Sequence, residues 1–331
     1  MTPRERYFAV LEGRSPDVVP RIPILMRFAA EFIGSNYGAF AADHRVLVGA
    51  NLAAAAAFDF DQVSCISDPY RETQGFGARI EYPREDVPRA THPLADHPDL
   101  DQLPRPDPER AERMRDRLEA CRRYRAVCGG RYSILGWVEG PAAEAADLRD
   151  AANFLMDLAE EPEYAAALMD RCLETAIAFA LAQLACGADT IGIGDAIASQ
   201  VSPATYAALI QPREKALVRA IQAAGGRVRL HICGDIRRLL PGIGDLDVDI
   251  LDVDHMVGLT EARAAVGPEV VLAGNLDPVS AVLRGAPETI RAGVRRCRAE
   301  AGDPFMVNAG CEIPAGTPVE NLRALCEAIV G

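Results

Sequence analysis

His231 and Cys233 are the residues whose types and spacing first suggest chemistry. They lie in the segment RVRLHICGD (227–235), where apolar residues alternate with others as in a buried strand. Side chains two apart in a strand point to the same side, so this imidazole and this thiol are expected to share one face. Imidazole nitrogen and thiolate sulfur are ligands that zinc prefers, which makes the pair a candidate part of a metal site.

The order of elements predicts where that pair lies in the fold. Eight short apolar segments are typical of buried strands: 21–28, 60–67, 131–140, 189–195, 227–235, 250–254, 270–277 and 304–312. Amphipathic segments between them, such as 170–188 and 202–226, are typical of helices, and Pro212 is expected to kink or divide the second. Strands alternating with helices predict an α/β fold, a (β/α)₈ TIM barrel with an N-terminal extension; a doubly wound sheet is the alternative.

One stretch departs from the alternation of strands and helices. Residues 69–110 are rich in Pro, Asp and Arg and are expected to form a long excursion after strand 2, outside the barrel. No linker divides the chain, so residues 1–331 are expected to form a single TIM-barrel domain.

Cys311 extends the candidate metal site. Reacting groups in TIM barrels lie at the C-terminal ends of the strands, and the last predicted strand ends in VNAGCE, which places Cys311 at the same rim as His231 and Cys233. One nitrogen and two sulfurs would leave a fourth position of a zinc ion open for substrate. No local spacing rule links Cys311 to the other two, so a metal site and His and Cys packed as core residues both remain open on spacing alone.

Four further polar residues stand at predicted strand ends. Glu139 is a candidate catalytic residue, as a fourth zinc ligand or a substrate contact, although it could instead cap the helix that follows. Asp195 is the second candidate catalytic residue, expected to face the same mouth and to contact the substrate or a metal ligand. Asp68 and Asn275 are the candidate cofactor-binding residues.

Composition narrows the range of partners and compartments. The 331 residues are 49% hydrophobic and carry a formal net charge of −13, which disfavours nucleic acid or an anionic membrane as partner. We find no run of about 18 apolar residues and no signal-peptide core near the start, so a soluble cytoplasmic protein is expected. Nine scattered cysteines, an odd number, argue against a disulfide framework.

Several motifs resemble the uroporphyrinogen decarboxylase superfamily, more narrowly its zinc branch of methylcobalamin:coenzyme M methyltransferases and related corrinoid-dependent methyltransferases. The motifs are HICGD, GDAIASQVSPATYAALIQPREKALV, AGNLDPVSAVLRGAPETI and VNAGCEIPAGTPVENLRAL, and the resemblance is most specific over residues 131–328. In that branch a His-x-Cys pair and a distant Cys bind zinc. The resemblance therefore implies that His231, Cys233 and Cys311 are the zinc ligands.

The resemblance also implies an activity. It implies an enzyme, a zinc- and corrinoid-dependent methyltransferase, that moves a methyl group between methylcobalamin and a small thiol or methoxy compound. His255 in DVDHMVG nearly matches a cobalt-ligating Asp-x-His motif, but Val253 stands where that motif has Asp, and we find no flavodoxin-like domain. The corrinoid is therefore expected to arrive on a partner protein.

Two other functions are kept as alternatives. A uroporphyrinogen decarboxylase-like lyase fits less well, because PILMRFAAEF retains Arg27 but lacks the Gln and second Arg of the family's substrate-gripping run. In addition, Gly310-Cys311 stands where the decarboxylase has Gly-His. A non-catalytic barrel that binds a corrinoid or its carrier protein is the other alternative. The methyl donor and acceptor, the direction of transfer and the oligomeric state are left open.

Overall fold

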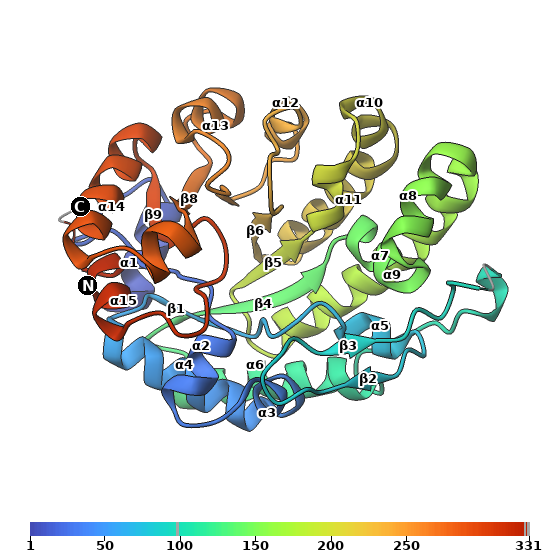
Figure 1. Cartoon of the computed structure of the whole chain (residues 1–331), viewed down its shortest axis with the longest axis horizontal. Helices are drawn as coiled ribbons and strands as arrows, with labels where there is room; N and C mark the ends of the chain where they lie inside the picture. Colours follow the sequence, from blue (N-terminus) through green and yellow to red (C-terminus); the bar gives the residue numbers. More distant parts are fainter. Residues whose placement is uncertain (97–98, 328, 330–331) are drawn as a thin grey trace.

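Seven parallel strands form one curled sheet at the centre of the molecule (Figure 1). The computed structural model describes residues 1–96, 99–327 and 329. The strands pair in the order β1-β4-β5-β6-β7-β8-β9, and all of these pairings are parallel. Their bounds are β1 Gln62–Ser64, β4 Ser133–Glu139, β5 Thr190–Gly194, β6 Arg227–His231, β7 Ile250–Asp252, β8 Val271–Leu276 and β9 Phe305–Ala309. Each lies within one of the predicted strand segments.

Helices connect the strands and cover the outer side of the sheet, as parallel pairing requires (Figure 1). The α-helices are α1 Pro3–Leu11, α2 Arg27–Phe32, α3 Tyr37–Ala42, α4 His44–Phe58, α5 Arg71–Gly75, α6 Glu112–Cys128, α7 Pro141–Arg149, α8 Ala151–Glu160, α9 Pro162–Ala185, α10 Pro203–Thr205, α11 Gln211–Ala223, α12 Leu240–Gly244, α13 Leu259–Val266, α14 Pro287–Ala301 and α15 Val319–Leu325. Among the described residues, none of the helices has both the length and the apolar character needed to cross a bilayer.

The first predicted strand, 21–28, is wrong. The backbone at its start forms one isolated bridge with Val307 of β9 and accepts a hydrogen bond of 2.9 Å from the amide of Asp61. Pro20 and Pro23 flank this point, and proline has no N–H to donate to a strand ladder. The segment therefore lies between β9 and the start of β1 without becoming a full strand, and the sheet has seven strands where eight were predicted.

The stretch between β1 and α6 leaves the sheet. It contains α5, an antiparallel pair formed by β2 (Ile80–Glu81) and β3 (Arg89–Ala90), and the short 3₁₀-helix η1 (Leu100–Gln102). Figure 1 shows this pair beside α5, away from the seven strands. Residues 97–98 of the predicted excursion and the last residues of the predicted final helix lie outside the described part of the chain.

Pro212 divides the predicted helix 202–226, as expected. The Ser202 side chain caps α10, a π-helical turn η3 (Tyr206–Ile210) follows, and α11 then begins at Gln211. Pro212 lies in the first turn of α11. Backbone N–H groups in a first turn have no acceptor within the helix, so a proline there costs no helical hydrogen bond. Two other irregular turns follow strands directly, η2 (Ala196–Gln200) after β5 and η4 (Pro278–Leu283) after β8.

Candidate metal centre

His231 and Cys233 meet at the C-terminal end of β6. His231 is the last residue of the strand, and its Nε2 lies 2.9 Å from Cys233 Sγ. Ile232 between them is fully buried on the other side, as strand alternation requires. Gly234 follows with φ +95°, a left-handed conformation that favours glycine, and its amide donates to Asp254. The chain therefore turns away directly after the thiol.

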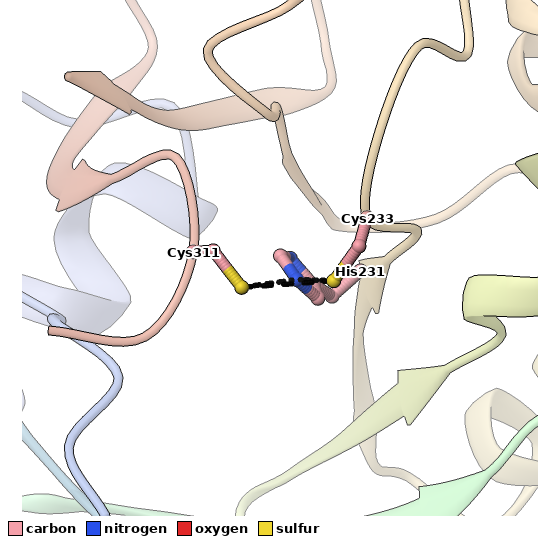
Figure 2. A group of neighbouring side chains, drawn as sticks. All are labelled: His231, Cys233 and Cys311. Atoms are coloured by element: carbon pink, nitrogen blue, oxygen red, sulfur yellow. Dashed lines mark hydrogen bonds between the residues drawn. The ribbon is translucent and has the colours of Figure 1, made fainter. Parts of the chain in front are cut away.

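Cys311 reaches the same point from the opposite side (Figure 2). It follows β9, and its Sγ lies 3.6 Å from Cys233 Sγ and 3.5 Å from His231 Nε2. A Cβ at Gly310 would lie 2.6 Å from the backbone nitrogen of His255, so only glycine lets this loop pass so close to its neighbour. The three predicted ligand atoms thus converge, one nitrogen and two sulfurs within 4.8 Å of one another.

The polar residues behind His231 hold its ring in a defined setting. The buried Nδ1 has no hydrogen-bond partner among the described residues, and Asp252 Oδ2 lies 3.9 Å from it. Arg229 donates twice to Asp252, at 2.7 and 3.0 Å, and Asn308 donates to it at 3.1 Å. A carboxylate on the far side of a ligating imidazole is the usual outer partner of a zinc site.

Proton sharing within the cluster favours a thiolate at Cys311. The hydrogen bond from Cys233 and the contact with His231 lower the pKa of Cys311 to about 4 against the opposing effect of burial. The same sulfur–sulfur contact, followed by burial, raises the pKa of Cys233. Burial would lower the pKa of His231, but the hydrogen bond and the negative charge of Cys311 raise it. Nitrogen and thiolate donors this close together form a set that can hold zinc.

The three side chains open onto a pocket with a cavity volume of about 190 Å³. Its apolar wall is made by Ile24, Met26, Ile66 and Trp137, which belong to one buried cluster. Three carboxylates also line the pocket: Asp68, Glu139 and Glu312. The pocket thus combines apolar side chains with the candidate metal ligands and carboxylates.

Glu139 ends β4 and lines this pocket, as predicted. Its Oε1 accepts hydrogen bonds from Arg71 at 2.6 Å and from the Trp137 indole at 3.1 Å. Burial raises its pKa well above the ordinary value, and the positive charge of Arg71 opposes that shift. Glu139 does not cap the following helix, because the N-cap residue of α7 is Gly140, which offers no side-chain cap. Glu139 is therefore placed to contact a bound molecule.

Asp68 also lines the pocket, at the loop after β1. Both of its oxygens accept hydrogen bonds from Arg113, at 2.6 and 2.7 Å, and the Ser67 hydroxyl donates to it at 2.6 Å. Burial acts to raise the pKa of Asp68, but the charge and hydrogen bonds of Arg113 more than offset this and lower it. Asp68 is thus a buried carboxylate that remains ionised beside the pocket.

Asp195 and Asn275, the other two predicted site residues, lie outside the described lining of the pocket. Asp195 is fully buried and accepts hydrogen bonds from the amides of Ala142 and Ala143, so it turns under the start of α7 and is absent from the described lining of the pocket. The carboxyl oxygens of Asp195 satisfy two backbone N–H groups in the first turn of α7, where the helix itself offers no acceptor, which explains this orientation.

Asn275 is likewise absent from the described lining of the pocket. Its side-chain amide donates to the backbone carbonyls of Asp254 and Val257, at 3.2 and 2.6 Å. These two hydrogen bonds hold the loop after β7 in place. His255, in the same loop, lies with its Nδ1 2.9 Å from Asp254 and is partly exposed.

Arg71 and Glu312 are absent from the candidate residues that the sequence suggested. β9 ends at Ala309, three residues before Glu312, so strand alternation does not determine the direction of the Glu312 side chain. Glu312 lines the pocket and accepts a hydrogen bond of 3.2 Å from the Arg27 amide. Arg71 lies in a region of no clear periodicity, and the sequence carried no signal for its contact with Glu139.

Comparison with known proteins adds relatives that align along nearly the whole chain. A methylated-thiol–coenzyme M methyltransferase of Methanosarcina mazei is 26% identical over 334 residues, covering 99% of this chain and 89% of that protein. Methylcobamide:CoM methyltransferase MtaA of Methanosarcina barkeri is 27% identical, with 99% and 97% covered. A uroporphyrinogen decarboxylase of Gloeobacter violaceus is 28% identical over 286 residues, with 82% and 80% covered.

The fold has a counterpart among solved structures. A structure described as a methyltransferase from Methanosarcina mazei superimposes with a TM-score of 0.90 and 24% identity, covering 98% of this chain and 97% of that one. That similarity establishes a shared fold. The uroporphyrinogen decarboxylase (URO-D) family matches residues 2–330. Since that match spans almost the entire chain, the protein belongs to the uroporphyrinogen decarboxylase family.

Proposed function

We propose that this protein is a zinc-dependent methyltransferase that moves a methyl group between a corrinoid, carried by a partner protein, and a small thiol or methoxy compound. The observation that carries the proposal is the meeting of His231, Cys233 and Cys311 at the mouth of one pocket. The naming of two relatives as coenzyme M methyltransferases, one of them acting on methylcobamide, supports the same reaction class.

In this proposal His231, Cys233 and Cys311 hold the zinc. A zinc ion bound by three protein ligands acts as a Lewis acid, which lowers the pKa of a thiol or polarises an ether oxygen in its open position. Asp252 orients His231 from behind.

In this proposal, methyl transfer to a thiol is an in-line displacement in which every bond formed and broken is accounted for. The thiol proton leaves to solvent, the sulfur electron pair forms a bond to the methyl carbon, and the cobalt–carbon bond breaks with its electron pair remaining on cobalt. A free thiol with a pKa near 8.5 is only slightly ionised at neutral pH, so stabilising the thiolate raises the reactive fraction. Glu139 and the apolar wall of the pocket position the small molecule against the metal ligands.

A decarboxylase-like lyase is the second candidate function, because relatives named uroporphyrinogen decarboxylase also match. A substrate with many carboxylates needs several cationic anchors. Among the described residues neither Arg nor Lys lines the pocket beside the three candidate ligands. Arg27 lines an adjoining pocket that shares Asp68 and Glu312 with it, and its side chain donates to Glu31, so a single cation, already paired, stands near the site. The pocket therefore favours methyl transfer over decarboxylation of a polyacid.

Metal content and turnover test the proposal together. Protein purified without chelator is expected to hold about one zinc per chain, and Cys311→Ala is expected to lose it. Cys186→Ala is the matched control, since Cys186 is a half-buried cysteine on the outer helix layer and is expected to leave the zinc in place. Methylcobalamin with a panel of thiols and methoxy compounds then tests transfer. Protein without zinc, or zinc content unchanged in Cys311→Ala, overturns the proposal.

A further inference from the structure

The sulfurs of Cys233 and Cys311 lie close enough together for a second chemistry. Resting on the proposed function for their role as zinc ligands, we infer that in the metal-free protein these two cysteines close into a disulfide under mild oxidation, so that the site holds either zinc or the disulfide. The inference depends on three properties of the pair: the distance between its sulfurs, the irregular chain beside it and its access to the pocket.

The distance between the two sulfurs requires only a small movement. Sγ of Cys233 lies 3.6 Å from Sγ of Cys311, and the two side chains arrive from opposite sides (Figure 2). A disulfide has a sulfur–sulfur distance of about 2.0 Å, so the sulfurs must approach each other by roughly 1.6 Å. Rotation of a cysteine side chain about its Cα–Cβ bond, together with a small shift of the backbone, supplies a movement of this size.

The backbone beside both cysteines is irregular, which allows such a shift. Cys233 follows β6, and the chain runs irregularly from there to α12, which begins at Leu240. Cys311 follows β9, and the chain is again irregular up to α15, which begins at Val319. Segments of this kind lack the repeated backbone hydrogen bonds of helices and strands, so they resist a local displacement less.

A second pair of cysteines provides an internal comparison. Sγ of Cys65 lies 3.5 Å from Sγ of Cys121, a similar distance, but both residues have an exposure of 0%. Cys121 lies within α6, and Cys65 directly follows β1 and donates its amide to Leu135 of β4, so regular structure holds both. Cys233 and Cys311 are partly exposed and line the pocket, through which a small oxidant reaches them. Access to solvent, rather than distance, therefore distinguishes the two pairs.

Oxidation of the pair by hydrogen peroxide is a balanced reaction of two steps. One thiol sulfur forms a bond to a peroxide oxygen as the oxygen–oxygen bond breaks, which gives a sulfenic acid and one water. The other sulfur then forms the sulfur–sulfur bond as the sulfur–oxygen bond breaks, and the departing hydroxide takes the second thiol proton to give a second water. Both sulfurs are oxidised and the peroxide is reduced. A disulfide offers zinc no thiolate, so of the three candidate ligands only His231 remains.

The test is peptide mapping of the full-length protein after oxidation. Zinc-loaded and metal-free samples are treated with the same small excess of hydrogen peroxide, alkylated and digested with trypsin. The digest places Cys233, Cys311, Cys65 and Cys121 in four separate peptides, residues 230–237, 299–323, 46–71 and 118–122. Metal-free protein is expected to yield the first two peptides linked to each other and to lose two of its nine thiols. In zinc-loaded protein the same link is expected to form at least about tenfold more slowly, because the metal occupies both sulfurs.

Variants assign the link to the pair. Cys311→Ser is expected to give no linked peptide, whereas Cys121→Ala, which removes the buried pair, is expected to keep the link between Cys233 and Cys311. Metal-free wild-type protein that keeps all its thiols, or that links Cys65 to Cys121 in preference, overturns the inference. A link that forms equally fast with and without zinc overturns it as well.

Zinc uptake separates this inference from the proposed function. Oxidised protein is expected to bind no zinc, and treatment with dithiothreitol is expected to restore about one zinc per chain. If the link forms in a protein that takes up no zinc even when reduced, the proposed function fails and the redox pair stands. If the protein binds zinc and transfers methyl groups but its metal-free form gives no link, the proposed function stands and this inference fails.

Discussion

Asp252 is the buried carboxylate that lies between the candidate metal centre and the core of the sheet. It lies 3.9 Å from His231 and is held by two hydrogen bonds from Arg229 and one from Asn308. Both Asp252 and Arg229 are buried, with side-chain exposures of 1%. In such a pair each charge depends on the other, since water cannot compensate a charge that loses its partner.

Replacing Asp252 by Asn is expected to lower the free energy of unfolding by about 3–5 kcal/mol, because it leaves the buried charge of Arg229 without its partner. The measurement is urea unfolding of metal-free protein. Asp235→Asn is the control: it breaks a pair with Arg237 whose side chains are 44% and 54% exposed, and such pairs contribute about 0–1 kcal/mol. If both variants lose the same free energy of unfolding, burial does not make the Asp252–Arg229 pair more important than the exposed one.

The Asp68–Arg113 pair predicts a dependence of stability on pH. Because the pKa of Asp68 is lower in the folded protein than its unfolded value of about 3.9, its stabilisation is fully present above that pH and is lost as the pH falls below it. Asp68→Asn is therefore expected to lower the free energy of unfolding at neutral pH. In acid, the free energy of unfolding of this variant is expected to fall less steeply with pH than that of the wild-type protein. Urea unfolding at several pH values below about 5 tests this. If the free energy of unfolding falls with pH by the same amount in the wild-type protein and in Asp68→Asn, the prediction is wrong.

At the scale of elements, β4 and β5 form one side of the pocket through the fit of Trp137 over glycines. Trp137 of β4 is directly paired with Gly192 of β5, and Glu139 is paired with Gly194. Side chains at the two β5 positions would fill the space that the indole needs. The strand segment TIGIG thus fits against β4. Glycine weakens a strand, but at these positions it makes the packing of the Trp137 indole possible.

Gly192→Ala is expected to destabilise the protein by about 1–3 kcal/mol, since the added Cβ would overlap the indole ring. It should also shift the tryptophan fluorescence, because Trp137 is the single Trp of the chain. Gly49→Ala is the control: Gly49 lies on α4 with no atom within 4 Å of an added Cβ, and alanine is expected to stabilise that helix by about 0.5–1 kcal/mol. Thermal unfolding followed by fluorescence measures both changes.

At the scale of the whole molecule, the candidate metal centre joins two distant parts of the chain. Cys233 and Cys311 are 78 residues apart in sequence and 3.6 Å apart at their sulfurs. The strands that carry them, β6 and β9, are not neighbours in the sheet, and β7 and β8 lie between them. A bound metal would therefore hold the curled form of the sheet, and we propose that residues 1–331 fold as one domain around it.

Removal of zinc is expected to lower the melting temperature of wild-type protein by several degrees. A ligand present at about 100 times its dissociation constant stabilises the folded state by about 2.7 kcal/mol. Differential scanning calorimetry with and without chelator measures the effect. In Cys311→Ala the chelator is expected to have no effect, because that variant lacks the site; a similar drop in both proteins would place the metal elsewhere.

Much of this organisation could be predicted from the sequence, because the spacing of apolar residues indicates which side of an element is buried. Seven strands were confirmed, and so were the break at Pro212 and the convergence of His231, Cys233 and Cys311. The strand at 21–28 was wrong because its apolar pattern was given more weight than Pro20 and Pro23, which cannot donate to a ladder.

The orientations of single polar side chains were less predictable. Asp195 and Glu139 both stand at strand ends, yet one turns to the amides at the start of α7 and the other to the pocket. That choice depends on which donors the tertiary structure brings near, such as Arg71 from a distant helix. Position along a strand predicts the rim on which a residue lies but not the direction of its side chain.

The separation of the three ligands along the chain has a consequence for biosynthesis. A nascent chain that has emerged only as far as β6 presents His231 and Cys233 alone, which is an incomplete and weak site. The complete set exists only after residue 311 has been made and β9 has joined the sheet. Under the proposed function, zinc is acquired only after β9 has joined the sheet, so metal supply acts after the strands have assembled rather than at the start of folding.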